Sequence, residues 1–176
     1  MHIAVVSLGA FGHVNPTLEL VTELVRRGVR VTYFCTEGFR TIVEPTGAQF
    51  VAVPSWMEAH AGESGEDKSD VAATVPFLFL HEAEAYLEPV LAVLKEDRPD
   101  AIVHDFAGIA GTLAADVLGV PNVMLYTSYP ANGEYSVAAG FETVSPDHPL
   151  RVAADELADR FVVQYGCRKM TVKENF

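Results

Sequence analysis

Two residues far apart in the sequence, His13 and Asp105, are the best candidates for chemistry in this chain. A neutral imidazole can take a proton from a hydroxyl near neutral pH. A carboxylate on its other ring nitrogen fixes the tautomer and stabilises the imidazolium that forms. The two residues together would therefore work as a general base. The ordinary alternative is that Asp105 caps a helix beginning near Gly108.

Strands and helices alternate in the hydrophobic pattern that must position this pair. Short apolar runs predict strands at 2–7, 30–35, 49–53, 101–104 and 122–126. Helices are expected at 16–27, 39–44, 71–96, 108–118 and 151–164, the third interrupted near Pro76 and Pro89, with loops at 9–14, 54–70 and 127–149. This alternation predicts an α/β fold, a Rossmann-like doubly wound parallel sheet forming a single domain over 1–176.

The expected strand order 3-2-1-4-5 places a switch point between the first and fourth strands, where such sheets bind ligands. His13 follows the first of these strands, and Asp105 ends the fourth. Neighbouring strands lie about 4.8 Å apart, so the two side chains are expected to meet. Gly9 and Gly12 are expected to let the backbone turn sharply and to leave room for a substrate.

Composition and missing motifs exclude several classes of function. The 176 residues carry a formal charge of −12, which argues against nucleic acid and against an anionic membrane surface. The two cysteines, Cys35 and Cys167, have no metal-binding spacing, so no metal site is expected. Neither a dinucleotide fingerprint nor a P-loop lysine is present, which disfavours a nucleotide-binding Rossmann protein. Without a recognisable signal peptide or membrane-spanning stretch, we expect a cytoplasmic location.

Four segments resemble a known family over nearly the whole chain. The segment at 9–16, which reads Gly-Ala-Phe-Gly-His-Val-Asn-Pro, resembles the opening of the GT-B glycosyltransferases. It is most similar to that of the macrolide and natural-product UDP-glycosyltransferases. The resemblance continues through 23–33, 98–105 and 119–121.

The resemblance implies a GT-B fold and a transferase of the hexosyltransferase type. It makes His13 the base that deprotonates an acceptor hydroxyl and Asp105 its carboxylate partner. The chain would be the acceptor-binding part of an inverting enzyme that moves a sugar from a nucleotide-sugar to an apolar small-molecule aglycone. The nucleotide-sugar would be a co-substrate of the complete enzyme, and no cofactor is expected. The candidate acceptor-binding residues are Phe11, Gly12, Trp56, Phe77 and Tyr129. Aromatic residues at such positions, Phe79 and Phe106 among them, more often pack a core than contact a ligand, but several together could line an apolar acceptor pocket.

The chain departs from the family pattern in one large respect. The family's donor-binding motif, rich in glycine and histidine, is absent, so the chain is expected to be the N-terminal acceptor domain without the C-terminal donor domain. It should then be inactive alone, and self-association is expected through the strand edge at 123–126 and an incompletely covered last helix bearing Leu157, Phe161 and Val162. The alternative is a non-catalytic or split-enzyme partner that binds a small molecule or a donor-domain chain.

Overall fold

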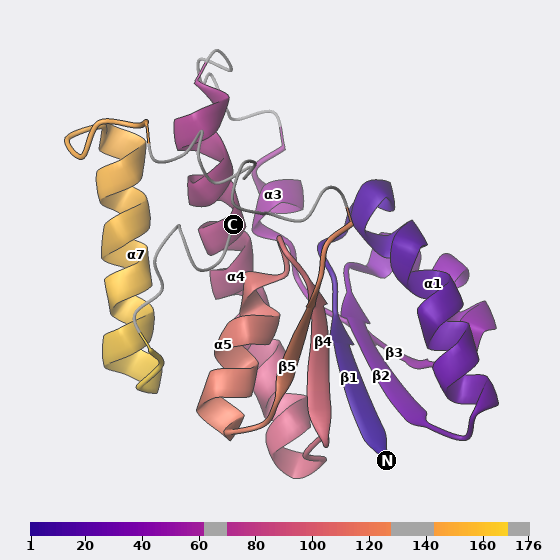
Figure 1. The fold of residues 1–176 in the computed structure, drawn as a ribbon. Helices are drawn as coiled ribbons and strands as arrows, with labels where there is room; N and C mark the ends of the chain where they lie inside the picture. Colours follow the sequence, from indigo (N-terminus) through magenta and orange to yellow (C-terminus); the bar gives the residue numbers. More distant parts are fainter. Residues whose placement is uncertain (62–69, 128–142, 169–176) are drawn as a thin grey trace.

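A computed structural model describes residues 1–61, 70–127 and 143–168, which form a five-stranded parallel sheet with helices on both faces (Figure 1). The strand order is β3-β2-β1-β4-β5, as the sequence predicts. The strands are β1 (His2–Val6), β2 (Arg30–Cys35), β3 (Gln49–Ala52), β4 (Ala101–Asp105) and β5 (Asn122–Leu125). The predicted fold class is therefore confirmed, and β1 and β4 are hydrogen-bonded neighbours.

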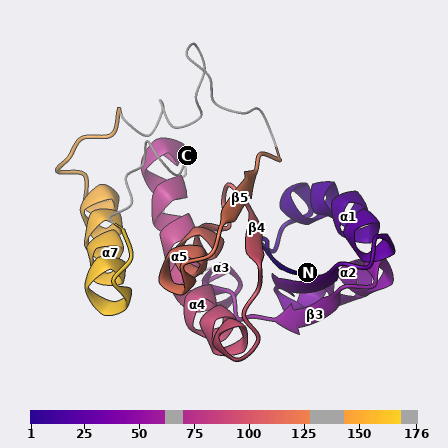
Figure 2. The ribbon, with the colours of Figure 1, turned by 60° about the horizontal axis from the view of Figure 1, so that its bottom comes forward.

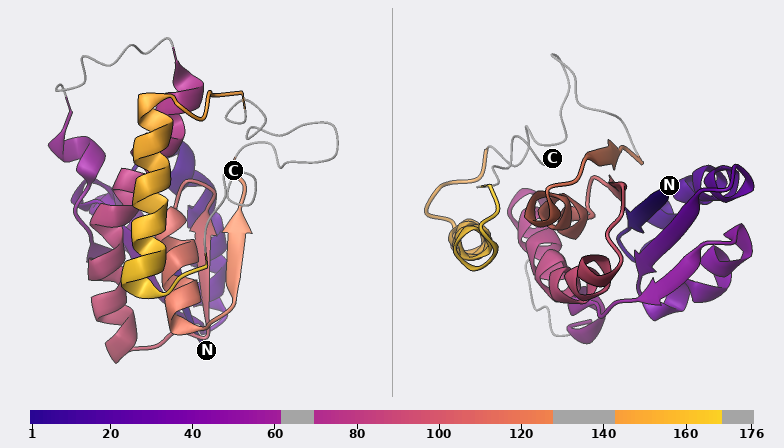
Figure 3. Two further views of the ribbon diagram at one scale, coloured as in Figure 1. Left: turned by 90° about the vertical axis from the view of Figure 1, so that its left-hand side faces the viewer. Right: turned by 90° about the horizontal axis from the view of Figure 1, so that it is seen from below.

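Two helical layers cover the sheet, and one further helix lies outside them. On one face lie α1 (Phe11–Arg26) and α2 (Arg40–Val43), the latter flanked by the 3-10 turns η1 (Glu37–Phe39) and η2 (Glu44–Thr46). On the other lie α4 (Val71–Glu96) and α5 (Ile109–Leu118), with the short α3 (Trp56–Ala59) beside α4. Figure 2 and Figure 3 show α7 (Pro149–Tyr165) as an outer helix, and it packs against α4.

Successive side chains of β1 point to opposite faces of the sheet, and both faces are covered by helices. This explains why the strands appear in the sequence as continuous apolar runs. Ile3 and Val5 belong to the core under α1 and α2, whereas Ala4 and Val6 belong to the core under α4 and α5. A strand covered on both faces has no solvent-facing positions to fill with polar residues.

Helix α1 begins earlier than the sequence indicates. The sequence predicts a helix that starts at Pro16, but the N-cap is Ala10, and Pro16 lies inside the helix. The extended backbone of Ala10 turns the chain, and its carbonyl accepts hydrogen bonds from the backbone N–H groups of His13 and Val14, both at 2.9 Å. The expected loop at 9–14 is thus largely helix, and His13 sits in the first turn rather than on a loop.

The other corrections concern segments around prolines and turns. Helix α4 runs without interruption through Pro76 and Pro89, because its buried face against the sheet and α5 offsets the lost backbone hydrogen bonds. The expected loop at 54–70 contains α3. The predicted positions of the remaining strands and helices agree with the structure to within two residues, except that α2 and its flanking turns are more fragmented.

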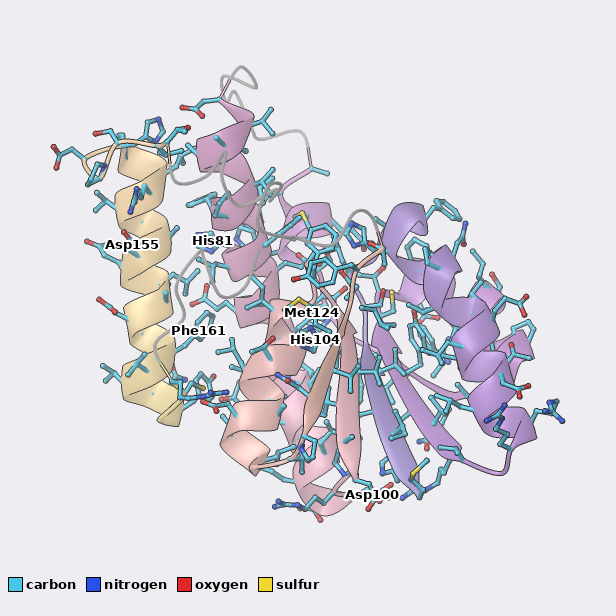
Figure 4. All side chains as sticks on the ribbon, in the orientation of Figure 1. His81, Asp100, His104, Met124, Asp155 and Phe161 are labelled. Carbon is cyan, nitrogen blue, oxygen red and sulfur yellow. The ribbon has the colours of Figure 1, made fainter. Side chains whose placement is uncertain are left out.

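The last helix is better covered than expected. Leu157 and Phe161 are 1% and 3% exposed, respectively, because α7 turns them toward α4 and α5, and Figure 4 shows Phe161 on that side. The prediction that these residues lack cover is therefore wrong, although Val162 is only half-buried. At the sheet edge, Val123 and Tyr126 are exposed, as expected for the outer strand of the described sheet.

Helix α5 lies close enough to β4 that only glycine fits at one position. A Cβ on Gly111 would lie 2.5 Å from the Cβ of His104, so Gly111→Ala is expected to lower the free energy of unfolding by about 1–3 kcal/mol. Gly12→Ala is the matched control, because a Cβ there meets nothing within 4 Å. It should leave the free energy unchanged or raise it by up to about 1 kcal/mol. Denaturant unfolding measures both, and equal losses would contradict the close approach of α5 to β4.

Candidate active site at the ends of β1 and β4

The Asp105 carboxylate is the centre of the site. It ends β4, its side chain is wholly buried, and it accepts three hydrogen bonds. Oδ1 accepts from the ring Nδ1 of His13 at 2.8 Å and from the backbone N–H of Ala107 at 2.9 Å. Oδ2 accepts from the backbone N–H of Leu8 at 2.9 Å. The expected meeting of His13 and Asp105 is therefore present, and three segments converge on one carboxylate.

These contacts decide between the two interpretations of Asp105. Helix α5 has Gly108 as its N-cap, with no side-chain hydrogen bond at that end. Asp105 instead accepts the N–H of Ala107, before the helix begins. The carboxylate thus orders the two loops and the imidazole rather than capping α5.

The hydrogen bond to Asp105 also fixes the tautomer of neutral His13. A carboxylate has no proton to donate, so Nδ1 carries the hydrogen, and Nε2 is left with its lone pair. The His13 side chain is 17% exposed, whereas that of Asp105 is fully buried. Asp105 is therefore held in place away from water, whereas the Nε2 atom of His13 can take a proton from a bound molecule.

Glycines allow the backbone to pack closely around the His13–Asp105 pair. A Cβ on Gly9 would lie 2.6 Å from Thr36 Oγ1, and one on Gly108 would lie 2.8 Å from the carbonyl oxygen of Val6. The expected sharp turn is present at Gly9, where the backbone N–H of Ala10 donates to the carbonyl of Leu8 at 2.8 Å, but not at Gly12, which lies within α1. Gly12 instead leaves open space in the same helical turn as His13.

Aromatic rings lie beside the imidazole. The ring of Phe106 lies 5.3 Å from that of His13, measured between centroids. Phe79 and Tyr126 contact Phe106 in turn, at 6.3 and 6.5 Å. The residue that follows Asp105 in the sequence therefore begins an apolar wall next to the basic nitrogen.

A second aromatic cluster is built on α3 and α4. Trp56 is stacked between His60, at 4.2 Å, and His81, at 4.7 Å, while Phe77 meets its edge at 5.9 Å. The structure thus brings together two predicted acceptor-binding residues, Trp56 and Phe77. The two histidines have no signal in the sequence beyond their i, i+4 spacing from Trp56 and Phe77.

The remaining predicted site residues lie elsewhere. Phe11 is 63% exposed in the first turn of α1 and packs edge-on against Phe39, with 5.1 Å between ring centroids. Tyr129 lies outside the described residues. His104, next to Asp105, faces α5: its Nδ1 donates to the carbonyl of Asp105, and its Nε2 accepts from the Thr112 hydroxyl. Burial lowers the pKa of His104, which favours the neutral ring in this structural role.

Two simple patterns, a cluster of metal-binding side chains and a membrane-spanning helix, are absent from the part of the chain that the structure describes. Within it, His, Cys, Asp and Glu side chains form no group of three or more that could hold a metal ion. None of its helices combines the length and the apolar character needed to cross a bilayer.

Asp105→Asn is expected to disturb both the fold and the tautomer. An amide offers one acceptor oxygen where the carboxylate offers two, so a buried N–H loses its partner, at a cost of about 1–3 kcal/mol in the free energy of unfolding. If the amide NH₂ faces His13, the ring proton moves to Nε2. Denaturant unfolding and ¹⁵N–¹H correlation spectra of the imidazoles measure the two effects.

Asp100→Asn is the control for this experiment. Asp100 lies at the opposite end of the sheet and accepts a hydrogen bond from the backbone N–H of His2 (Figure 4). We expect the tautomer of His13 to be unchanged in this variant. If His13 kept its proton on Nδ1 in Asp105→Ala, which leaves no acceptor at that position, the carboxylate would not be what fixes the ring.

Several glycosyltransferases are similar to this chain in sequence. No protein-family model matches the chain. It is 34% identical over 158 residues to the NDP-glycosyltransferase YjiC of Bacillus licheniformis, covering 88% of this chain and 39% of that protein. It is 36% identical over 127 residues to the oleandomycin glycosyltransferase of Streptomyces antibioticus, covering 70% and 29% of the two proteins.

Solved structures agree with the sequence relatives. The calicheamicin glycosyltransferase CalG4 superposes with a TM-score of 0.82 and 30% identity, covering 98% of this chain and 44% of that one. The matched part of the chain thus spans between 29% and 44% of the length of these proteins. By sequence and fold together, it belongs to the GT-B family of macrolide and natural-product glycosyltransferases.

Proposed function

We propose that this chain is the acceptor-binding, N-terminal part of an inverting glycosyltransferase, with His13 as the general base and Asp105 as the residue that orients it. The observation that carries the proposal is the 2.8 Å contact between His13 Nδ1 and the buried Asp105 carboxylate. This contact leaves Nε2, at the exposed end of the pair, as the atom that meets an acceptor.

The proposed reaction is a single displacement at the anomeric carbon of a nucleotide-sugar. The acceptor oxygen forms the new C–O bond as its proton passes to His13 Nε2. The bond from the anomeric carbon to the diphosphate breaks, and the nucleotide diphosphate leaves with that electron pair. One displacement inverts the anomeric configuration. Asp105 stabilises the imidazolium that results.

The acceptor we propose is an apolar natural-product aglycone. The aromatic wall at Phe106 and the cluster around Trp56 offer apolar surface to such an acceptor. Two relatives bear the names oleandomycin glycosyltransferase and calicheamicin glycosyltransferase, which points to large natural products as acceptors. Oleandomycin is therefore a suitable probe.

Binding by the purified chain tests the acceptor role first. We expect oleandomycin to bind saturably and to change the fluorescence of Trp56, which is the single tryptophan of the sequence. UDP-glucose, titrated calorimetrically, should bind weakly or not at all. Stoichiometric micromolar binding of UDP-glucose would instead favour a nucleotide-binding protein, and an absence of macrolide binding would remove the acceptor assignment.

The base is tested in a chimaera that joins this chain to the part of the Bacillus licheniformis relative that it does not match. His13→Gln should lower kcat for sugar transfer by about 10²- to 10⁴-fold, the usual contribution of a general base. Glu19→Gln, an exposed change on the same helix, serves as the control and should leave kcat unchanged. If His13→Gln retained full kcat, His13 would not be the base.

A further inference from the structure

Helix α4 carries a buried carboxyl group that the His13–Asp105 pair does not use. Glu82 is 3% exposed and lies among apolar neighbours on the buried face of the helix, including Leu80 and Ala83. Placing a carboxyl group there costs free energy unless hydrogen bonds compensate. Burial accordingly raises the pKa of Glu82, and hydrogen bonding at the start of α3, chiefly from the backbone N–H of Met57, partly offsets that rise.

These hydrogen bonds connect Glu82 to the first turn of α3. Its Oε2 accepts from the backbone N–H of Met57 at 3.0 Å. The next N–H, that of Glu58, is satisfied by the Ser55 hydroxyl at 3.0 Å. The free N–H groups at the start of a helix need such acceptors. Glu82 thus completes the N-terminal cap of α3 from another helix.

Helix α3 has little else to hold it. It contains four residues, none of them buried. Its attachment to α4 consists of the Glu82 hydrogen bond and of the ring contacts that Trp56 makes with Phe77 and His81. The orientation of Trp56 should therefore depend on Glu82.

The same carboxyl group lies next to the loops that hold Asp105. Glu82 and Tyr86 line a small cavity together with Leu8 and Ala107, whose N–H groups donate to the Asp105 carboxylate. The cavity has a volume of about 10 Å³, at the lower limit of the space that one water molecule needs. Glu82 Oε1 and the Tyr86 hydroxyl have no hydrogen-bond partner within the described residues.

We propose that Glu82 is a positioning residue of the acceptor site, whose carboxyl group fixes α3, and with it Trp56, relative to the His13–Asp105 pair. The inference rests on the proposed function in one respect: it treats the aromatic cluster around Trp56 as part of the surface that binds the acceptor. The link from Glu82 to Trp56 can be measured without any ligand.

Three variants of the chain test this link through Trp56 fluorescence. Glu82→Leu keeps the side-chain size but removes the acceptor, so the emission should shift to longer wavelength and acrylamide should quench it more strongly. Glu82→Gln retains an amide oxygen for the N–H of Met57 and should keep the wild-type emission and quenching. Tyr86→Phe alters the same cavity without removing the acceptor of α3, and it should also leave the signal unchanged.

Oleandomycin titration of the same variants then addresses the acceptor site. Glu82→Leu should weaken binding by about tenfold, equivalent to about 1.4 kcal/mol, whereas Glu82→Gln should bind like the unmodified chain. If Glu82→Leu folds, by circular dichroism, yet shows unchanged Trp56 quenching, the positioning role is overturned. If the quenching changes but the unmodified chain binds no oleandomycin, the proposed acceptor function fails and the link from Glu82 to α3 stands.

If Glu82→Leu does not fold, hydrogen exchange on the unmodified chain tests whether Glu82 holds the start of α3. The Met57 amide should then be protected to a degree similar to the amides of α4, because its acceptor is buried. Exchange at the rate of an unstructured peptide would overturn the proposal.

Discussion

One buried carboxylate, that of Asp105, holds together the segments on which the site depends. It receives the N–H of Leu8 after β1, the N–H of Ala107 after β4, and the ring of His13 from α1. An anion without such partners would be too costly to bury beneath a sheet edge. With three donors the carboxylate is held in one position. Removing it would leave the N–H groups of two loops and the ring of His13 without their acceptor. The arrangement requires β1 and β4 to be neighbours, which the strand order provides.

The two ends of the proposed dyad lie in different environments, and that difference assigns their roles. Asp105 is dry and saturated with hydrogen bonds, so it is suited to orienting the ring rather than to exchanging protons with a ligand. His13 reaches solvent from the first turn of α1, next to the open space above Gly12. A bound hydroxyl can approach the imidazole there while Phe106 covers one side of the ring.

The sequence predicted the parts of this site that follow from topology, and it missed those that follow from packing. Strand order and strand ends sufficed to bring His13 and Asp105 together across 92 positions. The start of α1 was misjudged because Pro16 is typical of a first helical position, whereas the hydrogen bonds to the Ala10 carbonyl set the true start. The stacking of His60 and His81 on Trp56 depends on how α3 meets α4, which no local pattern encodes.

Glu82 shows why such a residue escapes sequence analysis. Helix α4 carries four acidic residues, and acids on a helix are typical of a solvent-exposed face. Only the structure reveals that Glu82 points inward to the start of α3. Trp56 can be held with so little buried area because hydrogen bonds in a dry environment are directional and costly to break. A short helix fixed in this way can present an aromatic ring at a site edge without joining the core. Trp56 thus stays only half-buried, while a buried carboxyl group supplies the rigidity that burial of α3 itself would otherwise provide.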